Sequence, residues 1–143
     1  MRTIVLRPAS ERLTDLRERV ARVHREVLAA ERVRLERDLG RIPAVEYLRL
    51  LTQDPTLAWV RPLGRLVAGM DAVLADARKT GSPVEEQELD GFRADTRRLL
   101  GRPLPGEFTT RYLGWLREEP SVVLAHAAVM TLLRRDEAPL AAA

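Results

Sequence analysis

Hydrophobic residues recur every three or four positions along most of this chain, and no stretch alternates apolar and polar residues with period two. Such spacing places apolar side chains on one face of a helix. The pattern therefore predicts an all-α fold without a sheet. Residues that start and stop helices divide the chain into about six segments, which we expect to form a single-domain bundle over residues 1–143.

The first predicted helix is long. It covers residues 11–39, between an N-cap at Ser10 and a stop at Gly40. Its apolar positions form a narrow stripe: Leu13, Leu16, Val20, Val23, Val27 and Ala30. A stripe of this width is typical of helices that pair along a seam. Self-association through this helix, or through a helix hairpin, is therefore the leading expectation for function.

Prolines, glycines and caps set the other boundaries. Further helices are predicted over residues 43–53, 55–79, 82–100, 107–118 and 120–135. Pro62 falls inside the third helix, where we expect a kink because proline removes a backbone donor and clashes with the preceding turn. The run Ser82-Pro83-Val84-Glu85 has the form of a capping box. Residues 1–9 are expected to be an extended arm and residues 136–143 a frayed tail.

Two segments of the chain resemble each other at a constant offset of 65 positions. Residues 47–57 and 112–122 share a tyrosine, two leucines and a proline at equivalent places. Both are predicted to form a helix, an acid-proline break and a second helix. Two similar three-helix units could have arisen by duplication, or two similar helical corners by convergence, and the sequence leaves both open.

Composition and charge narrow the possible partners. The chain is 45% hydrophobic and 31% charged, which indicates a globular fold, and it contains no cysteine, which excludes disulfides and thiolate sites. Lys79 is the only lysine among 24 basic residues, and the formal net charge is +3. Because the charges alternate in sign, a nucleic-acid partner is not expected. Weak binding of nucleic acid or of an anionic surface through arginine stays an alternative.

The sequence pattern indicates no targeting signal and no membrane-spanning segment. No basic–apolar–small pattern opens the chain, and the longest apolar run, residues 122–130, is interrupted by His126. We therefore expect a cytoplasmic protein without a membrane partner.

Motifs that carry chemistry are missing. The chain has no glycine-rich phosphate loop, no nucleophile elbow and no Glu-x-x-His spacing. No catalytic residue, metal ligand or cofactor is predicted, and a non-catalytic interaction protein, as a homo-oligomer or with another protein, is favoured.

Several ionisable residues nevertheless fall on or beside apolar faces. His126 is predicted at the centre of the stripe of the last helix, where a buried imidazole needs a partner because an unsatisfied group costs about 1–3 kcal/mol. Glu31 continues the stripe of the first helix and is either solvated on an overhang or paired with a buried base. With His24, Arg61 and Asp71, these residues form a candidate ligand-binding set, and the alternative function is binding of a small molecule or metal near His126.

Three runs carry a resemblance to a known group of sequences. His-Arg-Glu-Val-Leu at 24–28, Asp-Pro-Thr-Leu-Ala-Trp-Val-Arg-Pro-Leu at 54–63 and Pro-Ser-Val-Val-Leu-Ala-His-Ala at 120–127 resemble an uncharacterised family of small all-helical bacterial proteins. The resemblance extends from about residue 13 to 134, with Val60 where leucine is expected. It implies no activity. It suggests only that one set of residues should be considered together: His24, Glu31, Trp59, Arg61, Asp71 and His126.

Overall fold

The computed structural model describes residues 7–101 and 105–141, and these form an all-α bundle in which no described residue belongs to a strand. The α-helices are α1 (Ala9–Leu39), α2 (Ala44–Gln53), α3 (Arg61–Thr80), α4 (Glu86–Thr96), α5 (Glu107–Glu118) and α6 (Pro120–Ala141). A 3₁₀ segment, η1 (Pro55–Val60), precedes α3, and a π-helical segment, η2 (Arg97–Gly101), continues α4. The predicted fold class is confirmed. None of the described helices combines the length and hydropathy needed to cross a bilayer.

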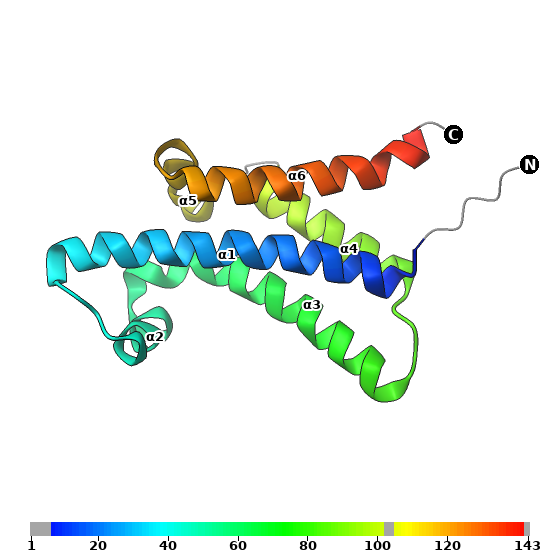
Figure 1. Ribbon diagram of the computed structural model, residues 1–143, viewed down its shortest axis with the longest axis horizontal. Coiled ribbons are helices and arrows are strands. Elements are labelled where there is room, and N and C mark those ends of the chain that lie inside the picture. The colour runs from blue at the N-terminus through cyan, green and yellow to red at the C-terminus, as the bar shows by residue number, and fades with distance from the viewer. Residues whose placement is uncertain (1–6, 102–104, 142–143) are drawn as a thin grey trace, which may run out of the picture.

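Helix α1 is the axis of the bundle. Figure 1 shows it lying between α6 on one side and α3 on the other, with α4 crossing near its N-terminal end. Its predicted stripe is buried, and all of the stripe except Ala30 belongs to the main core, together with apolar residues of α3, α4, α5 and α6. The stripe on which the expectation of pairing through α1 rested is therefore covered by the chain's own helices.

A smaller second core joins the C-terminal end of α1 to α2 and η1. It consists of buried Ile42, Tyr47 and Leu57 with Leu35, Leu50 and Leu51 packed against them. The Tyr47 hydroxyl donates a hydrogen bond to the carbonyl of Leu28. This core holds α2 below the end of α1, apart from the main core (Figure 1).

The chain around Pro62 differs from the expected kinked helix. Residues 55–60 form the 3₁₀ segment η1, and α3 begins at Arg61, so Pro62 lies in the first turn of a new helix. An α-helix running through Pro62 would press its ring against the carbonyl of Ala58, and a proline in a first turn avoids this clash. Asp54 caps η1 as expected, because its Oδ1 accepts the amide of Thr56 at 2.8 Å.

The capping box at the start of α4 lies three residues later than the sequence predicted. The N-cap is Glu85, whose side chain bonds to the amide of Glu88 while Glu88 bonds back to the amide of Glu85. Val84 before the cap and Leu89 in the first turn are both buried in the main core. They occupy the two positions of a hydrophobic staple. Burial of Val84 therefore favours a helix start three residues later than Ser82.

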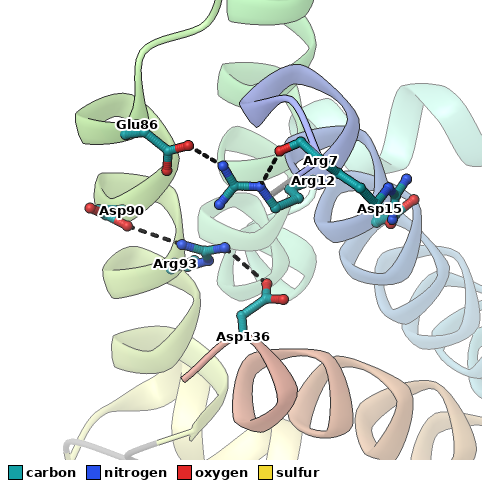
Figure 2. Close-up of polar contacts among 7 residues, drawn as sticks. All are labelled: Arg7, Arg12, Asp15, Glu86, Asp90, Arg93 and Asp136. Carbon is teal, nitrogen blue, oxygen red and sulfur yellow. Dashed lines mark hydrogen bonds and ion pairs between the residues drawn. The ribbon is translucent and has the colours of Figure 1, made fainter. Parts of the chain in front are cut away.

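Helix α6 continues further than expected. It extends to Ala141, past the end predicted near residue 135, while residues 142 and 143 lie outside the described part, and the predicted fraying of residues 136–143 stays a prediction. Asp136 accepts a hydrogen bond from Arg93 of α4 at 3.0 Å, which holds this part of α6 against the bundle (Figure 2). Of the predicted arm, residues 1–6 are not described, and Ala9 already belongs to α1.

Ion pairs gather at the end of the molecule where α1 begins. Arg93 bonds to Asp90 as well as Asp136, and Arg12 bonds to Glu86 of α4 (Figure 2). Arg12 also donates to the carbonyl of Arg7. These contacts join the first turns of α1, the helix α4 and the last turns of α6.

Candidate functional site

Glu31 is fully buried and both of its carboxylate oxygens have protein partners. Trp115 of α5 donates its indole N–H to Oε1 at 2.8 Å, and Arg34, one turn along α1, pairs with Oε2. The guanidinium of Arg34 also lies over the Trp115 ring, 6.0 Å from its centroid. Glu31 is therefore paired and not solvated, but its base, Arg34, keeps 38% of its side chain exposed and is not the buried base that the sequence analysis considered. Its partners tie α1 to α5.

His126 lies at the edge of the buried face of α6 and is half-buried, whereas we expected it at the centre. The stripe consists instead of Val122, Ala125, Val129, Leu132 and Leu133. The Nδ1 atom of His126 shares a hydrogen bond of 2.7 Å with the hydroxyl of Tyr112. Burial lowers the pKa of His126 and raises the pKa of Tyr112. The pair therefore joins two neutral groups near pH 7.

Asp71 forms an ion pair across α1 and α3. Its two oxygens accept hydrogen bonds from Nε and Nη2 of Arg17 at 2.7 and 3.2 Å. Both side chains remain partly open to solvent, in a depression of about 600 Å³ between α1, α3 and the loop before α4. Neither Glu31, His126 nor His24 lines this depression.

His24 and Arg61 are the two candidate residues that the fold brings together. They line one groove of about 330 Å³ between α1, α2, η1 and α3. Arg61 donates through Nη2 to the carbonyl of Thr52 at 2.9 Å. His24 lies against α3, since a Cβ added at Gly64 would be 3.3 Å from its Nε2 atom. Glu31, Asp71 and His126 do not line this groove.

Arg65 also lines the groove, and the sequence analysis did not select it. It follows Arg61 by four residues, a spacing that places two side chains on the same face of a helix. This four-residue spacing is the feature of the sequence that could have identified Arg65. The sequence alone did not show which face of α3 turns toward His24.

The described residues contain no group of three or more His, Cys, Asp or Glu side chains that could hold a metal ion. The groove that holds His24 and Arg61 is lined by basic and apolar side chains, which suit an anion or an apolar molecule.

Large exposed hydrophobic residues occupy one end of the molecule, opposite the end where α1 begins. Those among the described side chains are Val33 and Leu39 of α1, Val45 and Leu48 of α2, and Val123 and Leu124 of α6. The C-terminal end of α1, the whole of α2 and the first turns of α6 all lie at the left of Figure 1. On α2, Val45 and Leu48 are three residues apart and share the face turned away from Tyr47.

Comparison with known proteins adds nothing to this picture, because no family model, curated protein or solved structure matches the chain. The resemblance to an uncharacterised helical family stays a prediction.

The two histidines predict how stability depends on pH. Burial lowers the pKa of both His24 and His126 below the ordinary value of 6.5. The unfolded chain therefore binds protons more readily as the pH falls through 6.5, and stability that is complete above this pH is lost toward the lower folded pKa values. We expect a lower urea midpoint at pH 5.5 than at pH 7.5.

A double variant, His24→Asn with His126→Asn, isolates this effect and should have a flatter pH dependence over the same interval. Asp54 and Glu46, whose pKa values are lowered by Thr56 and Arg49 respectively, titrate below this interval. Equal pH dependence of stability in the parent and the double variant would contradict the attribution of this pH dependence to His24 and His126.

Proposed function

We propose that this chain is a non-catalytic self-association module in which two copies pair through the outer face of α2. The observation that carries the proposal is that α2 exposes two large apolar side chains outside the face that packs on the second core. Tyr47, Leu50 and Leu51 face the second core, while Val45 is 81% exposed and Leu48 is 62% exposed. An exposed apolar patch with a polar rim is typical of a protein–protein contact.

The charges beside these two residues favour a second copy as the covering partner. Glu46 and Arg49 form an ion pair next to Val45 and Leu48. In a two-fold symmetric pair, the same patch must complement itself. An antiparallel pairing of α2 with its copy about a two-fold axis would bring the acid of one chain beside the arginine of the other.

The charge of the surrounding segment is also balanced. Residues 31–54 contain five arginines and five acids: Arg32, Arg34, Arg37, Arg41 and Arg49 against Glu31, Glu36, Asp38, Glu46 and Asp54. Two copies of this segment can approach without net repulsion, and opposite charges at an interface favour a defined orientation. Of the two routes expected from the sequence, the long helix and the helix hairpin, these observations favour the hairpin of α1 and α2.

The contacts of three of the candidate residues support a non-catalytic role. Glu31, Asp71 and His126 each bond to another side chain of the fold. They lie in three different places and do not converge on one reacting position, as an active site would require.

The proposal is tested by molar mass in solution, measured by light scattering over a series of protein concentrations. We expect the parent chain to dimerise and Leu48→Glu to weaken dimerisation about 100-fold or more, because two leucines lose their burial and two carboxylates approach each other. Leu124→Glu is the matched control, since Leu124 has the same 62% exposure but belongs to α6. It should dimerise like the parent.

Two results would overturn the proposal. One is a parent chain that stays monomeric at every concentration. The other is dissociation by Leu124→Glu with no effect of Leu48→Glu, which would move the interface to α6. Circular dichroism of both variants establishes that each retains its helices.

A further inference from the structure

The groove that holds His24 and Arg61 has an apolar floor and a basic rim. Its apolar lining comes from α1, α2, η1 and α3: Leu28, Leu51, Leu57, Val60 and Ala68. The charged or ionisable residues in the lining are His24, Arg61 and Arg65, and no acid is among them. On a chain where arginines and acids otherwise alternate, this is a local excess of positive charge.

The basic groups keep hydrogen-bond donors that the fold does not use. Within the described residues Arg65 is exposed and makes no hydrogen bond or ion pair, as is also true of other exposed arginines such as Arg41 and Arg78. Arg61 uses one nitrogen on the carbonyl of Thr52. Its other guanidinium nitrogens have no protein acceptor among the residues that the structure describes.

The imidazole of His24 is also without a hydrogen-bond partner in this part of the chain, although it is half-buried. It can occupy this position because residue 64 is glycine, and a Cβ there would lie 3.3 Å from Nε2 and 3.6 Å from Cε1. A half-buried polar group normally finds a partner in the protein or in solvent. At His24, the open side is the groove.

We propose that this groove binds a small organic anion with an apolar body and a single carboxylate head, a site separate from the pairing face of α2. The carboxylate lies between Arg61 and Arg65, and the hydrocarbon part covers the leucine floor. Guanidinium groups suit this head because their planar N–H pairs match the two oxygens of a carboxylate. His24 contributes one further N–H at the edge of the groove.

The size and lining of the groove select among anions. A volume of about 330 Å³ lies at the lower end of the range for ligand pockets, which favours a short molecule. The apolar floor disfavours a compact, fully hydrated ion such as phosphate. Such an ion would leave most of the leucine surface in contact with water, so its binding would gain little from apolar burial. The lack of an acid disfavours a cation.

The test uses octanoate as the probe, with 1-octanol and octylamine as uncharged and cationic molecules of the same length. Isothermal titration calorimetry on the full chain should detect octanoate binding at least about 10-fold tighter than binding of either control, as expected for a charge-assisted contact. Imidazole ¹H–¹⁵N spectra provide a second measurement. Octanoate should shift the ring signals of His24 and leave those of His126 unchanged, because His126 lies outside the groove.

Arg65→Gln provides the variant test, because an exposed arginine without a partner can be replaced without loss of the fold. We expect octanoate binding to weaken about 10-fold. Arg78→Gln removes the same charge from the same helix outside the groove and should bind like the parent. Arg61 is less suitable, since it also bonds to Thr52.

The proposal is overturned if 1-octanol binds as tightly as octanoate, if saturating octanoate leaves the His24 signals in place, or if Arg65→Gln binds like the parent. None of these results depends on dimerisation. Leu48→Glu should bind octanoate whether or not α2 forms the pairing face, because Leu48 does not line the groove.

Discussion

Glu31→Ala is expected to reduce the free energy of unfolding by about 2–3 kcal/mol, because leaving a buried hydrogen-bonding group without its partner costs about 1–3 kcal/mol and the emptied space adds to this loss. The substitution leaves the indole N–H of Trp115 without its acceptor and Arg34 without its acid. It also leaves a cavity where a fully buried side chain stood. Urea unfolding followed by circular dichroism measures the effect.

Glu31→Gln separates the hydrogen bond from the charge. The amide oxygen of glutamine can still accept from Trp115 and fills the same volume, so we expect a smaller loss than for alanine. Trp115→Phe removes the other side of the same hydrogen bond. If Glu31→Ala changed the free energy of unfolding by less than about 1 kcal/mol, the contact of Glu31 with Trp115 would not stabilise the packing of α1 against α5 as its burial indicates.

Leu16→Ala is expected to destabilise the fold by about 2–5 kcal/mol, the range for truncating a leucine in a packed core. Leu16 is 1% exposed and belongs to the main core, on the helix that packs against both α3 and α6. The cost combines lost burial with a cavity that the surrounding helices cannot fill. Thermal unfolding and urea unfolding should agree on the size of the effect.

Leu124→Ala is the control for this prediction. It makes the same chemical change at a leucine that is 62% exposed, and should alter stability by no more than about 0.5 kcal/mol. Similar losses for the two variants would contradict the placement of α1 at the centre of the bundle.

The helix boundaries that the sequence predicted best are those set by local chemistry. Helix α5 covers residues 107–118 as predicted, because glycine and proline precede it and an acid-proline pair follows it. The start of α4 was less determined, since Ser82 and Glu85 can both cap a helix. Burial of Val84 decided between them, and burial depends on the rest of the fold.

The candidate site was only partly predictable for a similar reason. Periodicity correctly marked Glu31 as a polar residue on an apolar face, but its partner Trp115 is 84 positions away. The grouping of His24 with Arg61 and Arg65 depends on the way α3 lies across α1 after η1. Helix packing of this kind is a tertiary property, which a single sequence does not encode in its local spacing.

The two corners that share a sequence pattern have different chemistry at their tyrosines. Tyr47 bonds to a backbone carbonyl, which does not titrate, whereas Tyr112 bonds to His126, which does. The hydrogen bond between α5 and α6 therefore includes a partner that titrates, and the corresponding bond of Tyr47 does not. Protonation of His126 therefore alters the hydrogen-bond partner of Tyr112, whereas the partner of Tyr47 is the same at every pH.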